Sequence, residues 1–398
     1  MRLADVVIIG AGIGGLLAAA KLSREFDVAV YERLPIIGGR FTNLPYKGFQ
    51  LTTGALHMVP HGATGPLGQA LKDIQAKVEI IKSEPPAVVR REDGSCVIIR
   101  DQRDQFKEFG LNRLKFLIYQ AKIVLSGKRN NLVHILRTNP RYMKFADAFF
   151  GWALSLNLNE VPASELVATV RNINKYGNTP GIPVGGCKAV TDAIAETIRG
   201  QINMNSEVER IIVKNKKVTG IETEGEFVSA EYVISDIGPD ATNKLLGLKD
   251  LREKPSAGIK ISLSSDEKLI GHTGVFLTPF MRRVKGLNEV TNADPNLAPP
   301  GKNLVMSHQT LQSTNLNEEI HLGLKDLKDL FGNKFEVLLV QSYYNGWPVN
   351  RMAAGIDAPN RTQYKNLYLV GDGAKKSGGI EVEGVALGVE RVVSAILN

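Results

Sequence analysis

The chain has 398 residues, of which 43% are hydrophobic, and a formal net charge of +8 at pH 7. This length and composition exclude a disordered chain and suggest two or more domains around a large core. Only two cysteines, Cys96 and Cys187, are present, so a disulfide framework or a zinc site cannot be built and we expect no bound metal. Scarce cysteine favours a reducing, cytoplasmic compartment.

The N-terminal segment has the pattern of a dinucleotide-binding unit. Residues 6–9 form an apolar, β-branched run typical of a buried parallel strand, and residues 16–22 are expected to form a helix. The turn between them contains Gly10, Gly12, Gly14 and Gly15. Glycines at this spacing permit a tight turn, let the backbone approach a pyrophosphate and let the helix pack closely on the sheet, with its N-terminal dipole facing the phosphates.

A second strand, residues 28–31, ends in Glu32. Glu32 lies 20 residues beyond Gly12 (32 − 12), the separation expected for the acid that accepts the ribose hydroxyls. We assign the adjacent Arg33 to the same end of the cofactor. A chance match, or the apolar core of a signal peptide behind Met1 and Arg2, would leave Glu32 unexplained.

Basic residues are concentrated between positions 107 and 144. The nine are Lys107, Arg113, Lys115, Lys122, Lys128, Arg129, Arg137, Arg141 and Lys144, against one acid, Glu108. Apolar residues recur at helical spacing over 111–125, which predicts a basic amphipathic helix. Such a helix suits an anionic membrane surface from which a lipid-soluble substrate could enter, but a helix packed on the core has the same period, and we favour that second interpretation. Nucleic-acid binding is not expected, because no recognised motif accompanies the charge.

Further elements are predicted along the rest of the chain. We expect a helix that follows residues 183–187 and reaches about residue 199, a hairpin over 208–213 and 217–222, and two strands over 258–263 and 336–342. The last elements are a buried strand over 367–370 and an amphipathic helix over 382–396, whose N-terminus could face an anionic group. Between them lie Gly371-Asp372-Gly373 and Gly378-Gly379, which mark breaks.

The two terminal patterns together resemble the FAD-binding segments shared by phytoene desaturases, protoporphyrinogen oxidase and the flavin-containing amine oxidases. Residues 32–40, ERLPIIGGR, contain the Gly-Gly-Arg that follows the ribose acid in that superfamily. The resemblance is strong over 6–54 and 366–392 and moderate over 183–236. It implies FAD as the cofactor.

The resemblance also implies site residues. Gly38, Gly39 and Arg40 match the pyrophosphate loop, and Gly371, Asp372, Gly379 and Val382 match the C-terminal motif and the backbone beside the flavin. In relatives the segment after the loop returns along the flavin, which implies close approach of Thr53, Gly54 and Ala55. Val208 matches a valine whose backbone contacts the adenine, although an ordinary hairpin explains it equally well.

Catalytic and substrate-binding candidates follow from the same resemblance. His57 lies just after the flavin-facing segment and has an ordinary pKa near ~6.5, which suits an acid or base, although a histidine in an apolar stretch is more often simply hydrogen-bonded. Tyr343, Tyr344 and Trp347 are aromatic residues that could line an apolar substrate cavity or pack in the core. We assign no counterpart of the amine oxidases' flavin-facing lysine, and Thr52 or Thr53 stands where phytoene desaturases usually place an aspartate.

These assignments predict an α/β fold in which a Rossmann-type FAD-binding domain is interrupted by insertions. Residues 1–85, 181–245 and 346–398 would form the FAD domain, and 86–180 and 246–345 an α+β substrate domain. The expected reaction transfers a hydride equivalent between flavin and a hydrophobic, isoprenoid-like substrate, with an unassigned electron partner. The alternatives are a flavin amine oxidase, a polyene isomerase, and a non-catalytic lipid-binding protein like the Rab GDP-dissociation inhibitors.

Overall fold

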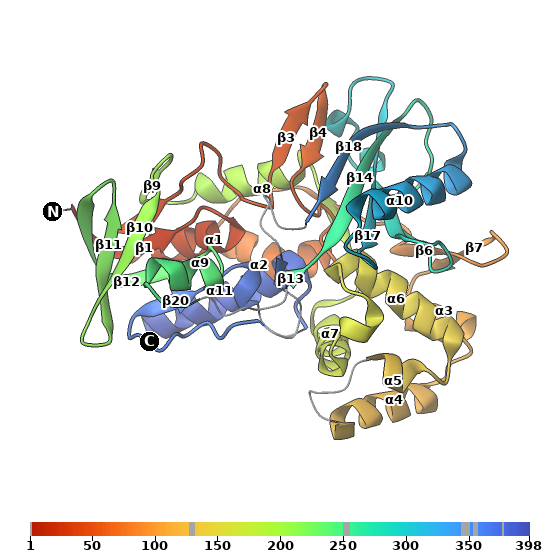
Figure 1. The fold of residues 1–398 in the computed structure, drawn as a ribbon, viewed down its shortest axis with the longest axis horizontal. Coiled ribbons are helices and arrows are strands. Elements are labelled where there is room, and N and C mark those ends of the chain that lie inside the picture. The colour runs from red at the N-terminus through yellow and green to blue at the C-terminus, as the bar shows by residue number, and fades with distance from the viewer. Residues whose placement is uncertain (1, 127–131, 250–254, 344–350, 353–356, 376–377) are drawn as a thin grey trace.

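The computed structural model describes residues 2–126, 132–249, 255–343, 351–352, 357–375 and 378–398. Two large sheets lie side by side, with a group of helices beneath the second (Figure 1). The predicted fold class, a Rossmann-type parallel sheet with a second α+β region, is confirmed. The residue boundaries between the two domains stay a prediction. In the described residues, no helix is both long and apolar enough to cross a membrane.

The first sheet brings together the two ends and the middle of the chain. Five strands run parallel in the order β9, β2, β1, β12 and β20. Their bounds are Gln201–Asn203, Val28–Tyr31, Arg2–Ile9, Glu226–Ser235 and Leu367–Leu369. In the predicted hairpin, β10 (Val208–Lys214) pairs antiparallel with β11 (Lys217–Thr223), and β11 pairs antiparallel with β12. The β11 strand pairs with residues 226–229 and β20 with residues 233–235, so both use the same long strand.

Helices cover this sheet through apolar contacts. The helix α1 (Ile13–Leu22) has no polar face and packs against α11 (Glu381–Leu397) and α8 (Gly186–Ala195), while α2 (Pro66–Asp73) also contacts α11. A Cβ at Gly15 would lie 2.2 Å from the Gly10 carbonyl oxygen, so only glycine allows this helix to approach its strand. A short helix, α9 (Pro239–Leu245), follows β12.

The second sheet is antiparallel except where β15 and β6 pair. In order, its strands are β18 (Glu336–Ser342), β14 (Gly258–Ser265), β17 (Asn303–Thr310), β16 (Val284–Glu289), β15 (Val275–Leu277), β6 (Ala87–Arg90) and β7 (Cys96–Ile99). The helix α10 (Leu316–Phe331) packs on it through Leu327, which belongs to the same apolar cluster as Ile259, Ile261 and Leu263 of β14. Alternate residues of β14, including Lys260, therefore point away from α10.

The smaller elements complete the fold. Three two-stranded sheets pair β3 (Asn43–Tyr46) with β4 (Phe49–Thr52), β5 (Ile80–Lys82) with β8 (Gly181–Pro183), and β13 (Pro255–Ser256) with β19 (Arg351–Met352). The helices α3 (Gln102–Glu108), α4 (Arg113–Ser126), α5 (Leu132–Leu136), α6 (Pro140–Leu154) and α7 (Ala163–Tyr176) share a separate aromatic core with β6, β7 and β15.

The helix α4 corrects one prediction. The favoured interpretation placed its periodic apolar stripe against the core, but Leu114 is 67% exposed and Leu125 86% exposed. Phe116 and Tyr119 are buried in its place. The helix packs through these two aromatic rings, which lie on the side away from the leucines, and so the apolar stripe faces outward.

Candidate cofactor and active site

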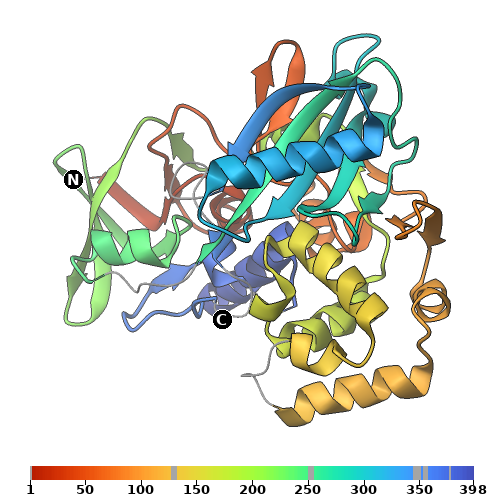
Figure 2. The same ribbon diagram turned by 45° about the vertical axis from the view of Figure 1, so that its right-hand side comes forward.

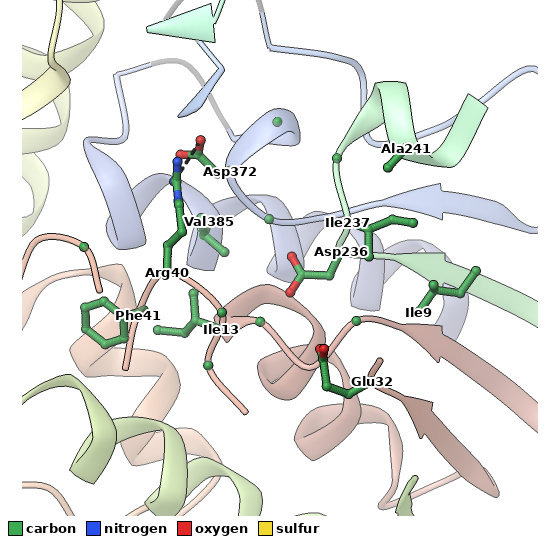
Figure 3. A pocket seen from close by; sticks show the side chains of 18 of the residues that line it. Ile9, Ile13, Glu32, Arg40, Phe41, Asp236, Ile237, Ala241, Asp372 and Val385 are labelled. Carbon is green, nitrogen blue, oxygen red and sulfur yellow. Dashed lines mark ion pairs between the residues drawn. The ribbon is translucent and has the colours of Figure 1, made fainter. Parts of the chain in front are cut away.

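A cavity of about 850 Å³ lies at the carboxyl ends of β1, β2, β12 and β20. This is the edge of a parallel sheet at which dinucleotides bind. Figure 3 shows Glu32, Arg40, Asp236 and Asp372 around it. The predicted site residues in its lining are Gly10, Gly12, Glu32, Arg33, Gly38, Gly39, Arg40, Gly54, Ala55, Val208, Tyr343, Gly371, Asp372 and Val382. Segments far apart in sequence thus meet at one cavity.

Other predicted residues lie behind the lining. A Cβ at Gly14 would come within 2.8 Å of the Gly371 nitrogen, so Gly14 lets the two glycine turns approach each other. Thr53 is buried and its hydroxyl donates to the carbonyls of Gly39 and Thr42, which ties the two loops together. Gly379 is buried beside α11. Tyr344 and Trp347 lie outside the described residues.

Glu32 fixes the backbone of two segments that border the cavity at the end of β2. Its two carboxylate oxygens accept hydrogen bonds from the backbone nitrogens of Ala11, at 2.8 Å, and Leu34, at 2.9 Å. The side chain is 8% exposed and lines the cavity. Because each carboxylate oxygen has a second lone pair, Glu32 can hold the turn after β1 and still accept from a ligand hydroxyl.

The C-terminal turn is fixed by charged side chains. Arg40 Nη2 lies 3.0 Å from Asp372 Oδ2, shown dashed in Figure 3. Lys375 Nζ lies 3.0 Å from Asp372 Oδ1 and 3.0 Å from Asp357 Oδ1. Asp372 is therefore paired with two cations, one from each end of the chain.

Asp236 is a site residue that the sequence analysis missed. It follows β12, accepts a 2.8 Å hydrogen bond from the Gly15 nitrogen and lines the cavity between the two glycine turns. Burial raises the pKa of this carboxyl to about 7; Glu32 and Asp372 add to the shift, while the Gly15 nitrogen and Arg40 oppose it. The signal was present, since an acid directly after a buried strand also marks Glu32.

Lys260 is a second missed residue. It is fully buried on β14, and its Nζ donates to Thr52 Oγ1 at 2.9 Å, to the Gly54 carbonyl at 3.1 Å and to the Thr52 carbonyl. Burial lowers the pKa of this ammonium to about 7. The lysine thus ties the second sheet to a loop that lines the cavity.

His57 does not line the main cavity. It lies in a neighbouring cavity of about 10 Å³, beside Trp152, whose ring makes an edge contact at 5.9 Å. Its Nε2 is 2.6 Å from Ser83 Oγ, and burial lowers its pKa to about 3, so the ring is neutral. Its acid or base role stays a prediction.

Three residues line both cavities and mark where they meet: Ala55, His308 and Glu381. Glu381 begins α11 with a φ of +50°, a left-handed conformation that a glutamate seldom adopts. Nearby in the lining, the Tyr343 hydroxyl donates to the Thr53 carbonyl at 3.2 Å. The part of the cavity lining where these residues meet is therefore polar as well as aromatic.

Comparison with known proteins shows which family the chain belongs to. Residues 8–74 match the model of an NAD(P)-binding Rossmann-like domain. The chain is similar to an uncharacterized protein of Methanocaldococcus jannaschii, at 45% identity over 98% of each chain. The crystal structure of an oxidoreductase from Methanosarcina mazei is 44% identical, with a TM-score of 0.88 over 98% of this chain and 100% of that one.

A more distant relative is the neurosporene-forming phytoene desaturase of Cereibacter sphaeroides, 25% identical over 58% of this chain and 52% of its own. The chain belongs to the FAD-dependent oxidoreductase superfamily of phytoene desaturases, protoporphyrinogen oxidase and amine oxidases. Within this superfamily the protein is an oxidoreductase. The family resemblance that the terminal motifs predicted is thereby confirmed.

Proposed function

We propose that the cavity binds FAD. The observation that carries this proposal is the convergence of both terminal motifs on one space, joined by the Arg40–Asp372 ion pair. Glycine is required at both turns beside Asp236, because a Cβ at Gly12 would lie 2.4 Å from Asp236 Oδ2 and one at Gly371 would clash with the same carboxyl. Side chains at these turns would fill the space that a pyrophosphate needs.

Named residues would hold each part of the group. Glu32 and Val208 would bind the adenosine end, Arg40 and the turn Gly10–Gly15 the pyrophosphate, and the start of α11 at Val382 would face the flavin. The N-terminal dipole of α11 stabilises negative charge placed beside it. When bound, the flavin would supply the hydride chemistry of an oxidoreductase.

The proposed reaction moves a hydride equivalent between a carbon of a hydrophobic, isoprenoid-like substrate and the flavin. The similarity to a phytoene desaturase supports this substrate class. The chain's own residues would position the substrate: Tyr343 and Ala55 lie in the lining, and Tyr343 is held by the Thr53 carbonyl. Electrons would pass to an acceptor of unassigned identity, in the cytoplasm or at a membrane surface.

Amine oxidation is a second candidate, and one observation favours it. The sequence analysis assigned no lysine to the flavin side, but Lys260 is buried against the loop that carries Gly54. His308 and Glu381 add polar groups at the same end of the cavity. These groups suit a substrate with a polar reacting end better than an unfunctionalised polyene.

Two experiments separate these functions. Ligands that copurify with the protein are extracted and identified by mass, and a bound isoprenoid would support the proposed substrate. The flavin-loaded protein is then mixed anaerobically with a polyene, a polyamine or an aromatic amine while the flavin spectrum is recorded. Bleaching by polyenes alone supports the proposal, and bleaching by amines alone contradicts it in favour of an amine oxidase.

The remaining alternatives give different outcomes. A polyene isomerase would require reduced flavin and change the geometry of the polyene without changing its mass. A non-catalytic lipid-binding protein would lack flavin absorbance and fail to bind added FAD. Either result would contradict the proposed hydride transfer.

A further inference from the structure

We propose that α4 forms a docking surface for an anionic lipid bilayer. The surface, called here the α4 surface, consists of the apolar residues Leu114, Leu117, Ile118, Ala121 and Leu125 and the basic residues Arg113, Lys115 and Lys122. This inference does not depend on the identity of the cofactor. It concerns where the protein resides, not what its cavity holds.

The apolar part of the α4 surface is unusually exposed. Leu114, Leu117, Ile118 and Leu125 are 67, 58, 44 and 86% exposed. They are four of the ten large hydrophobic side chains that are exposed in the described residues, and they lie on a single helix. Scattered exposed leucines need no explanation, but a contiguous apolar stripe marks an interaction site.

Buried aromatic residues on the opposite face of α4 fix the orientation of the helix. Phe116 and Tyr119 are 8% exposed, and the Tyr119 hydroxyl lies 3.0 Å from Thr138 Oγ1. The helix contacts α5 and α7. Because these aromatic rings hold the inner side, the leucines cannot turn into the core without exposing the rings.

The basic residues of α4 indicate that the α4 surface binds an anionic bilayer. The described helix carries three exposed basic residues, Arg113, Lys115 and Lys122, and its sequence contains no acid. Lys115 and Lys122 are seven residues apart, so they lie on one side of the helix, at the border between the leucines and the buried rings. From there their long side chains can reach lipid headgroups while the leucines enter the acyl region.

Two further observations favour a bilayer over another copy of this chain. Self-association through α4 would bring like charges together, whereas an anionic bilayer neutralises them. Further exposed basic residues, Lys107 on α3, Arg137 just after α5 and Arg141 on α6, add to the same sign of charge. Figure 2 shows α4 running along the outer edge of the molecule, away from the first sheet, where a flat surface could reach it.

Vesicle sedimentation tests the proposal directly. Vesicles of phosphatidylcholine, with or without phosphatidylglycerol, are mixed with the wild-type chain and with a Leu114→Asp/Leu117→Asp variant. The wild type should bind vesicles containing phosphatidylglycerol about tenfold more tightly than neutral ones. The variant should lose about tenfold in binding or more, because two apolar side chains no longer enter the bilayer.

Control variants test whether vesicle binding depends on the α4 surface itself. Leu397→Asp changes an exposed leucine, at 51% exposure, on α11, and it should bind vesicles as the wild type does. Lys115→Gln/Lys122→Gln keeps the leucines and should abolish most of the preference for anionic vesicles. The thermal midpoints of all variants should match the wild type, because every changed side chain is exposed.

Three outcomes would overturn the proposal. They are absence of binding by the wild type, equal binding to neutral and anionic vesicles, and unchanged binding by the Leu114→Asp/Leu117→Asp variant. Light scattering of the same samples tests the alternative occupant. A wild-type dimer that becomes a monomer in this variant, without vesicle binding by either, would assign the α4 surface to a second copy of the chain. Flavin content measured in parallel keeps this result separate from the cofactor proposal.

Discussion

Arg40 and Asp372 form an ion pair that joins the two ends of the chain at the cavity wall. The Arg40 guanidinium belongs to the loop after β2, and the Asp372 carboxylate belongs to the turn after β20. Both side chains are about one-fifth exposed, at 21 and 22%. Both residues line the cavity, so we attribute the position of the pair to the ligand that both segments face.

Glu32 is expected to select for the adenosine half of the cofactor. Glu32→Ala should weaken FAD binding by about 1.5 to 3 kcal/mol for each lost charge-assisted hydrogen bond. FMN lacks the adenosine ribose, so its affinity should change much less. Titrations of both flavins check the difference, and equal losses for FAD and FMN would show that Glu32 only holds the Ala11 and Leu34 nitrogens.

Asp236 should make flavin binding depend on pH. Its folded pKa, about 7, is above the value of 3.8 for an unperturbed aspartate. Above pH 7 the ionised carboxylate would repel a pyrophosphate, so FAD affinity should fall between pH 6 and pH 8.5 as ~pH 7 is crossed. Fluorescence titrations at several pH values check this, and Asp236→Asn should flatten the profile.

The same group contributes to stability with a definite sign. The folded chain binds the Asp236 proton more tightly than the unfolded chain, so its stabilising contribution is complete below about pH 3.8 and is lost as the pH rises to about 7. In urea unfolding of the flavin-free protein, the free energy of unfolding should therefore decline less across this pH window for Asp236→Asn than for the wild type. A decline identical to that of the wild type would contradict the assignment.

Lys260 should make the free energy of unfolding depend on pH in the opposite direction. Its folded pKa is lowered from 10.5 to about 7, so the unfolded chain binds more protons between these values and stability rises with pH across the window. Lys260→Met removes this rise and takes one hydrogen-bond donor from each of the carbonyls of Thr52 and Gly54, although the Thr52 hydroxyl still donates to the Gly54 carbonyl. Unfolding measured at pH 7 and pH 9 checks the change in slope, and flavin affinity reports whether the loop has shifted.

His57 is expected to matter little for proton transfer. The ring is neutral, hydrogen-bonded to Ser83 and outside the main cavity lining. His57→Gln should leave the rate of flavin reduction by a working substrate within about threefold of the wild type, since loss of an acid or base typically costs 10²-fold or more. A loss of about 10²-fold together with a changed pH profile would establish the catalytic role.

Local patterns predicted much of the fold. The strand 336–342 and the hairpin 208–222 were found nearly at their observed bounds because alternation and turn residues act over short distances. The orientation of α4 could not be predicted, because a 3.6-residue period is the same whether the stripe faces the core or solvent. Only Phe116 and Tyr119, packed against other helices, decide which side is inward.

Long-range contacts explain the missed site residues. Asp236 reaches the Gly15 nitrogen only because β12 pairs with β1, and Lys260 reaches Thr52 only because β14 lies over a loop far away in sequence. The Lys260 contact leaves no local pattern, and the acid that follows a buried strand at Asp236 does not indicate which backbone nitrogen it contacts. The motifs of the turn after β1 and of Gly371-Asp372, by contrast, were recognisable because glycine spacing reflects the local backbone.

FAD titration of the wild-type chain and of Arg40→Met tests the proposed cofactor site most directly. As a control, Lys302→Met removes an ion pair with Asp266; these residues lie just before β17 and just after β14 of the second sheet. We predict saturable binding of one FAD per chain, weakened about tenfold or more by Arg40→Met through loss of charge-assisted hydrogen bonds and unaffected by Lys302→Met. The unfolding free energy of both variants should change by only about 1 kcal/mol or less. Absence of saturable FAD binding by the wild type, or equal affinities for the wild type and Arg40→Met, would contradict the assignment of this cavity.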